Sequence, residues 1–322
     1  MSTQFSDFAP KNPIKSAQII GDGVSVETYK AQPNGPLVKR GHPDYVLGGS
    51  DISEFDHCPH RWVSGYKDEG TKSTEWGTIV DCLLMGGEPD QFAICPETYT
   101  SLKKVKGSLD AVVEEKPWNF NAEVCREWKE ERLAEGRMIV KHDVFESAFF
   151  AAELIMKDPQ LAGIFKASRK QVFIEGIYED RETGVSVPVK CLIDLVAPEM
   201  FLADFKTCQS AHPKPWARQV FNFGYHVQAA RHLDLWNTAT GEMRVEFRHY
   251  IQESYEPFEI GKRILSEEFV VLGRDRYLRS LKRYAQCIKT GVWPGYDVSK
   301  SNSDMVIDGH TLVSPEAWMV GE

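Results

Sequence analysis

The sequence predicts an α/β protein with a mixed central sheet flanked by helices. Short apolar runs separated by turn residues lie between residues 170 and 207, and another follows at 245–252. Segments with helical spacing of apolar residues surround these runs, at residues 121–135, 142–157, 213–238 and about 260–290. The chain has 322 residues, 42% of them hydrophobic, so it can bury a large core.

The N-terminal third is less regular. Residues 1–45 are interrupted by proline and glycine, and we expect an extended N-terminal arm there. A first helix is predicted from Ser50, because Asp51 and Glu54 have the spacing of an N-terminal cap, and it should stop near Pro59. A second helix is predicted at residues 74–86.

Residues 88–120 contain several prolines and are predicted to be irregular. We therefore expect three parts in the chain: an arm over residues 1–45, one main domain over 46–300 and a C-terminal tail over 301–322.

The most informative stretch runs from residue 190 to 207. Two apolar runs, at 191–193 and 201–203, are followed by Asp194 and Asp204, and residues 197–199 have turn composition, so a β-hairpin is expected. Lys206 lies two residues after Asp204 and should point to the same face. Two carboxylates and a lysine at one sheet edge could form a site for a hard cation with a cationic helper, which is suited to the cleavage of a phosphodiester.

Other residues extend this pattern. Glu175 lies on the preceding apolar run and is a candidate third acid, although Gln171 and Phe173 share its strand parity and could occupy that place instead. Tyr225 and Gln228 are three residues apart in a predicted helix, so they share one face.

This ordered set resembles the PD-(D/E)XK nuclease superfamily and, within it, the phage and prophage exonucleases of the exonuclease VIII (RecE) type. The similarity runs from about residue 40 to 296. Its motifs are Gly77–Leu84, Glu182–Gly184, Cys191–Asp194, Asp204–Thr207, Tyr225–Ala230 and Trp293–Tyr296. The resemblance implies a restriction-endonuclease-like core.

The resemblance also implies roles for single residues. Asp194 and Asp204 would bind the metal, with the Phe205 carbonyl as a backbone ligand. Lys206 would orient or deprotonate the attacking water, and Gln228 with Tyr225 would support the site. Relatives usually carry a histidine on the upstream helix, where this chain has Asp81.

An aspartate at this position is still an oxygen ligand suited to Mg²⁺ or Mn²⁺. Two interpretations of Asp81 remain open: a site that recruits additional cation, or a degraded site that holds metal weakly. Because Asp194, Asp204 and Lys206 are all present, we favour an active enzyme.

The function expected from the resemblance is an Mg²⁺-dependent exodeoxyribonuclease, for which Mn²⁺ can substitute. It would digest one strand of linear duplex DNA from a 5′ end and leave a 3′ single strand for an annealing protein, and it would assemble as a homo-oligomeric ring. The alternatives are a nuclease of the same core that acts on single-stranded or branched DNA, and a catalytically weak DNA-end-binding protein.

The net charge of −9 argues at first against a nucleic-acid partner. The charge is uneven, however, because Arg274, Arg276 and Arg279 lie in one basic helical segment. These arginines and Arg61 are candidate DNA contacts. The alternatives are a solvated helix face paired with acids for the basic segment, and a stacking or salt-bridge role for Arg61.

The seven cysteines show no paired spacing, and no long apolar span or signal peptide is visible. We therefore expect a cytoplasmic protein without disulfides and without a membrane partner.

Overall fold

The computed structural model describes residues 11–31, 34, 38–66, 72–87, 89–104, 111–296, 306–307 and 310–311. A six-stranded sheet forms its centre, in the order β1-β6-β7-β8-β9-β10. Neighbouring strands are antiparallel except β8 and β9, which are parallel, so the predicted mixed sheet is confirmed. The strands are β1 (Ile14–Gly21), β6 (Arg169–Glu179), β7 (Ser186–Val196), β8 (Phe201–Cys208), β9 (Glu246–Glu253) and β10 (Ile260–Ile264).

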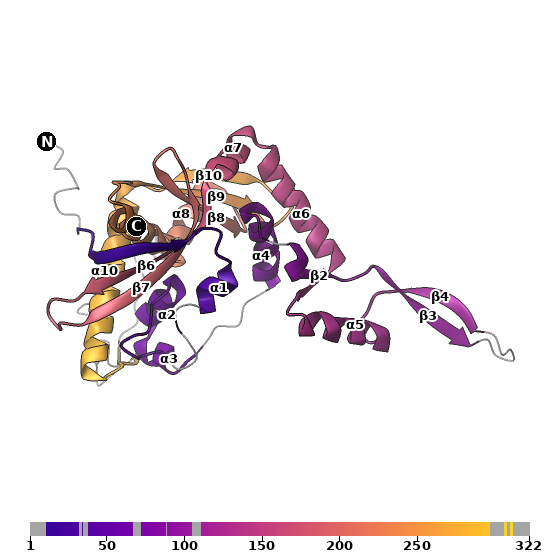
Figure 1. The fold of residues 1–322 in the computed structure, drawn as a ribbon, viewed down its shortest axis with the longest axis horizontal. Coiled ribbons are helices and arrows are strands. Elements are labelled where there is room, and N and C mark those ends of the chain that lie inside the picture. Colours follow the sequence, from indigo (N-terminus) through magenta and orange to yellow (C-terminus); the bar gives the residue numbers. More distant parts are fainter. Residues whose placement is uncertain are drawn as a thin grey trace.

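Helices cover both faces of this sheet (Figure 1). One hydrophobic core lies between the sheet and α2 (Gly49–His57), α3 (Pro59–Val63), α8 (Pro213–Asn222), α9 (Tyr225–Thr240) and α10 (Glu267–Thr290). A second core lies between the sheet and α4 (Lys72–Met85), α6 (His142–Lys157) and α7 (Pro159–Ala167). The predicted arrangement of a sheet flanked by helices is thus confirmed.

The first strand differs from the predicted arm. Residues Ile14–Gly21 form β1, which pairs antiparallel with β6 at the edge of the main sheet. A short helix, α1 (Val26–Ala31), follows it. Strand β1 lies at the edge of the sheet and alternates exposed and half-buried residues, and Ile14 is its one buried residue. Weak alternation and the surrounding glycines therefore hid the strand in the sequence.

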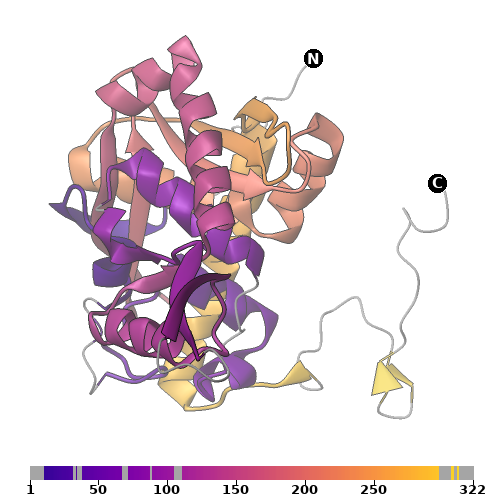
Figure 2. The same cartoon turned by 90° about the vertical axis from the view of Figure 1, so that its right-hand side faces the viewer.

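Residues 88–120 are also more regular than predicted. A short 3₁₀ turn, η2 (Pro89–Gln91), leads into β2 (Phe92–Ile94), which pairs in parallel with β5 (Met138–Val140). Strands β3 (Thr98–Lys104) and β4 (Ala111–Pro117) form an antiparallel pair that projects from the body beside α5 (Glu123–Ala134) (Figures 1 and 2). Pro117 ends its strand, a position where the missing N–H is tolerated, so proline did not exclude strand here.

The helix expected over residues 260–290 begins later. Residues 260–264 form β10, which pairs with β9, and α10 starts at Glu267 after the N-cap Ser266. Gly261 permits this pairing, because a Cβ atom there would lie 2.6 Å from the Ile251 side chain. Two further strands, β11 (Val306–Ile307) and β12 (His310–Thr311), pair with each other. Every helix within the described ranges is too short or too polar to span a lipid bilayer.

Candidate active site

The two central aspartates lie on neighbouring strands. Asp194 lies on β7 and Asp204 on β8, next to the last paired positions of the predicted hairpin, Leu195 with Ala203. The Phe205 backbone N–H donates a hydrogen bond of 3.0 Å to Asp194 Oδ2. The local fold therefore brings the two carboxylates to one place on the sheet.

Helix α4 adds Asp81 to the same place. The helix can approach β8 closely because residue 77 is a glycine, and a Cβ atom there would lie 2.7 Å from Thr207 Oγ1. Gly77, Thr78 and Asp81 line one cavity together with Asp194 and residues of β8. The Gly-x-x-x-Asp spacing places the glycine and the acid one helical turn apart on the face toward the sheet.

Helix α9 supports the site from the other side. Gln228 Nε2 donates to Asp204 Oδ1 at 2.8 Å, and the Lys206 ammonium lies 5.4 Å from the centre of the Tyr225 ring. The Tyr225 ring itself stacks on Trp216, with ring centres 5.5 Å apart. The shared helix face expected for Tyr225 and Gln228 thus contacts the lysine and the buried aspartate.

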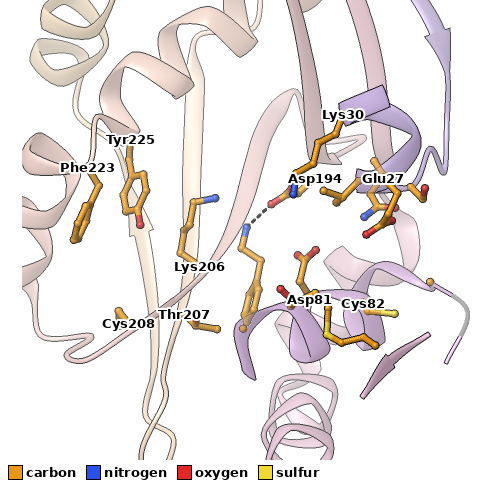
Figure 3. A pocket seen from close by; sticks show the side chains of 18 of the residues that line it. Glu27, Lys30, Asp81, Cys82, Asp194, Lys206, Thr207, Cys208, Phe223 and Tyr225 are labelled. Atoms are coloured by element: carbon orange, nitrogen blue, oxygen red, sulfur yellow. Dashed lines mark hydrogen bonds between the residues drawn. The ribbon is translucent and has the colours of Figure 1, made fainter. Parts of the chain in front are cut away.

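These groups surround a cavity of about 990 Å³, shown in Figure 3. Asp81, Asp194, Lys206 and Tyr225 line its wall, whereas Asp204 lies fully buried behind it. The other lining residues are Ser25, Val26, Glu27, Lys30, Gly77, Thr78, Cys82, Gly87, Gln91, Met138, Gln171, Phe205, Thr207, Cys208, Gln209, Gln219 and Phe223. A cavity of this size can admit part of a polymeric substrate.

The carboxylates repel one another. Burial and the nearby Asp204 raise the pKa of Asp194 well above its ordinary value, with a further contribution from Asp81. Burial also raises the pKa of Asp81 to about 6, because the opposing effect of Lys206 is smaller. The positive charge of Lys206 is thus too small to offset the burial and mutual repulsion of these carboxylates.

Asp204 and Lys206 partly neutralise each other. Burial alone would raise the pKa of Asp204, but Lys206 and then His249 hold it below its ordinary value. Burial would lower the pKa of Lys206, but Asp204 and Asp194 raise it, so the lysine is an ammonium. Asp204 Oδ2 forms an ion pair with this ammonium and is buried, and it has no other polar partner among the residues that the structure describes.

The structure places Glu175 outside this group. It pairs with Lys190 across β6 and β7, four residues along β7 from Asp194, and lines a different cavity. Gln171 occupies the wall of the active-site cavity instead, in a left-handed backbone conformation with φ 47°. We therefore do not retain Glu175 as a metal ligand. Gln171, the alternative that the sequence offered for this position, is the residue of β6 that lines the active-site cavity.

The chemistry of the donors fits a hard divalent cation. Asp81, Asp194 and Asp204 supply carboxylate oxygens, and their raised or compensated pKa values indicate unmet negative charge. Within the described ranges, however, no three side chains of His, Cys, Asp or Glu are grouped as a ready metal site. The Lys206 ammonium lies against Asp204, so metal binding would require this side chain to move.

The candidate DNA contacts are mostly engaged within the protein. Arg274 forms a buried ion pair with Asp234, at 2.8 Å. Arg276 pairs with Asp56 at 2.8 Å, and Arg61 stacks on the Tyr66 ring. Arg279 is the most exposed of the four, with 71% of its side chain accessible beside Asp275. The alternative interpretation of the basic segment, a helix face paired with acids, therefore describes Arg274 and Arg276.

Two charged cavity residues were not anticipated from the sequence. Glu27 and Lys30 come from α1, and Figure 3 shows Lys30 pointing down toward Asp194. Their helix was hidden in the region assigned to an arm. The available signal was Ser25, whose hydroxyl accepts the Thr28 N–H at 3.1 Å, as a helix-capping residue does.

The chain also matches a protein-family model. A family model described as a PDDEXK-like domain of unknown function (DUF3799) matches residues 49–302. The chain belongs to this family. The PDDEXK-like domain covers both aspartates, Lys206 and the supporting helix α9, and it indicates a nuclease acting on phosphodiester bonds of nucleic acid with a divalent metal.

Solved structures extend the comparison to the fold. A protein from Eubacterium rectale described as a "putative exonuclease" has a TM-score of 0.54 and 15% identity, over 93% of this chain and 98% of that one. The protein SSO0001 has a TM-score of 0.26 and 15% identity, over 65% of this chain and 86% of that one. The first similarity shows a shared fold, and the second is too low to carry an argument. No curated protein matches the chain.

Proposed function

We propose that this PDDEXK-like protein is a metal-dependent exodeoxyribonuclease. The observation that carries the proposal is that Asp194, Lys206 and Asp81 line one cavity, with Asp204 buried behind it in contact with Lys206. Asp81, Asp194 and Asp204 would hold Mg²⁺, for which Mn²⁺ can substitute, with the Phe205 carbonyl as an additional oxygen. When bound, the ion would neutralise the phosphate and lower the pKa of a water.

The residues of the chain supply the remaining functions. The Lys206 ammonium would stabilise negative charge that develops on the phosphate oxygens and position the attacking water. Because its pKa is raised, we assign it an electrostatic role and not that of a base. Gln228 holds Asp204 in place, and Tyr225 lies against Lys206, so both act as positioning residues.

The finer substrate assignment rests on the resemblance to exonuclease VIII. It consists of linear duplex DNA, digestion from a 5′ end, a 3′ single-stranded product for an annealing protein, and a ring-shaped homo-oligomer. The solved relative described as a "putative exonuclease" is consistent with an enzyme that acts at ends. A nuclease that prefers single-stranded or branched DNA would use the same residues.

A second candidate is a catalytically weak DNA-end-binding protein. Two observations favour it: Asp81 stands where relatives usually have histidine, and Lys206 contacts the aspartate that a metal would need. The net charge of −9 also disfavours tight binding to DNA unless the contact is local.

The deciding experiment uses 5′-labelled linear duplex and covalently closed circular DNA with Mg²⁺, comparing wild type with Lys206→Ala. We expect wild type to release mononucleotides from linear DNA alone, and the variant to lose at least about a hundredfold in rate, as for lost electrostatic stabilisation elsewhere. Shifted but uncut DNA would support the end-binding protein. Cleaved circles would indicate an endonuclease.

A further inference from the structure

Arg231 on α9 is a buried cation that has no hydrogen-bond or ion-pair partner among the described residues. Only 4% of the residue is exposed, and within the part of the chain that the structure describes its Nη1 atom has no hydrogen-bond acceptor. Its guanidinium makes no hydrogen bond or ion pair with any residue that the structure describes. An unpaired buried charge is costly, so proteins retain one where a ligand of opposite charge binds.

The surroundings of Arg231 form a cavity. Its volume is about 410 Å³, and the residues that line it include Gly49, Ser50 and Ser53 from the first turns of α2. The guanidinium lies directly against Gly49, where a Cβ atom would be 2.5 Å from Arg231 Nη2. The first backbone N–H groups of a helix have no acceptor within it, and with the serine hydroxyls they provide donors for an anion.

Three acids near this cavity have partners other than Arg231. Asp51 accepts hydrogen bonds from Tyr45, Trp62 Nε1 and the Gly48 N–H. Glu54 pairs with Arg40 at 2.8 Å, and Asp51 shares this arginine at 3.5 Å.

The third acid, Asp56, pairs with Arg276 at 2.8 Å and accepts a hydrogen bond from Ser280. Among the described residues, Arg231 takes part in none of these contacts, so its guanidinium remains available to an anion that enters the cavity.

We propose that this cavity binds a phosphate group of the nucleic-acid substrate, held by Arg231, the α2 N-terminus and the hydroxyls of Ser50 and Ser53. The cavity adjoins the active site, because Phe223 and Tyr225 line both. A strand could thus place one phosphate beside Arg231 and a neighbouring phosphate beside Lys206. The substrate named here rests on the proposed function. The phosphate can belong to a strand terminus or to the internal backbone.

The first test measures anion binding without catalysis. Inorganic phosphate is titrated in metal-free buffer against sodium chloride of equal ionic strength, and the melting temperature is recorded. We expect phosphate to stabilise wild type, and Arg231→Met to weaken its binding about tenfold or more, the loss typical of a hydrogen bond to a charged group. Arg126→Met, which changes an exposed arginine on α5, should leave binding unchanged.

The same variant tests whether Arg231 is structural. Without phosphate, Arg231→Met should melt at the same temperature as wild type or higher, because an uncompensated charge has been removed. A variant that melts well below wild type, or that binds phosphate equally well, would overturn the proposal. So would a wild type that phosphate does not stabilise. None of these outcomes depends on nuclease activity.

The second test identifies the source of the phosphate. Metal-free binding of duplexes with 5′-phosphate, 5′-hydroxyl and 3′-phosphate ends is compared by fluorescence anisotropy for wild type and Arg231→Met. Preference for one phosphorylated end that disappears in the variant would assign a terminal phosphate. Equal loss of affinity for all duplexes would assign an internal one. Unchanged affinity for every duplex would overturn the proposal.

Discussion

Asp194 carries a charge that the folded protein opposes. Its pKa is raised by burial and by Asp204, so the folded state prefers the neutral carboxyl group. A raised carboxyl pKa favours folding only when the group is protonated, and this contribution is lost as pH rises above the unfolded value of about 3.9. At pH 8 the ionised Asp194 therefore destabilises the protein unless a cation compensates it.

We predict that Asp194→Asn stabilises the metal-free protein. In buffer with a chelator at pH 8, its melting temperature should exceed that of wild type by about 2 °C or more, as expected for a gain near 1 kcal/mol. Mg²⁺ should raise the melting temperature of wild type and leave that of the variant unchanged. Asp44→Asn, at an exposed residue, is the matched control. A variant less stable than wild type under chelation would contradict the electrostatic account.

The residues of the site differ in how far the sequence could predict them. Asp194, Asp204 and Lys206 follow from local pattern, because two strands joined by a turn must place their ends together. Gln228 follows from helical spacing. The position of Glu175 was predicted wrongly, because the left-handed conformation at Gln171 cannot be read from the alternation of residues along the strand. Arg231 could not be found either, since its isolation depends on contacts between α2 and α9.

Helix α4 positions Asp81 through its contact with β8. The close approach depends on Gly77, because Thr207 Oγ1 lies 2.7 Å from the position that a Cβ atom would occupy. The Thr207 Cβ atom is 3.8 Å from the same position, which is an ordinary contact distance. The crowding at this helix-to-sheet contact therefore comes from the threonine hydroxyl.

We predict that Gly77→Ala displaces α4 and that Thr207→Ala restores it. The single substitution should cost about 1–3 kcal/mol in the free energy of unfolding, the usual range for overpacking. The double variant should recover most of this loss and should bind Mg²⁺ more tightly than Gly77→Ala alone. Denaturant unfolding and calorimetry measure both quantities. Equal losses in the single and double variants would show that the contact does not position the helix.

At the scale of elements, the sequence predicted the central hairpin and the helices around it but missed short or weakly amphipathic strands. Strand β1 is an edge strand with one buried residue, and β3 and β4 leave Leu102 and Val113 largely exposed. Strand β10 has five residues and precedes a long helix, so its pattern merged with helical spacing. Tertiary pairing decides such segments, and local propensity does not.

Across the whole molecule, two buried histidines connect stability to pH. Burial lowers the pKa of His232 to about 3 and that of His249 to about 4. His232 lies on α9 and His249 on β9, and both ring nitrogens of His249 are buried without hydrogen-bond partners among the described residues. Both side chains are therefore neutral in the folded protein, whereas they would ionise near pH 6.5 in the unfolded chain.

The sign of the effect follows from these values. A histidine with a lowered folded pKa stabilises the fold fully above pH 6.5, and this contribution is lost as pH falls from 6.5 toward the folded value. We predict that the free energy of unfolding falls by about 2 kcal/mol per histidine between pH 7.5 and 5, since one pKa unit corresponds to about 1.4 kcal/mol. Urea unfolding at both pH values, on wild type, His232→Leu and His249→Leu, measures this loss. Each variant should remove the contribution of its histidine, about 2 kcal/mol, from this pH dependence, whereas His42→Leu, at an exposed residue, should leave the pH dependence unchanged. If both buried-site variants keep the wild-type pH dependence, the acid sensitivity arises elsewhere and the neutral state assigned to these histidines is wrong.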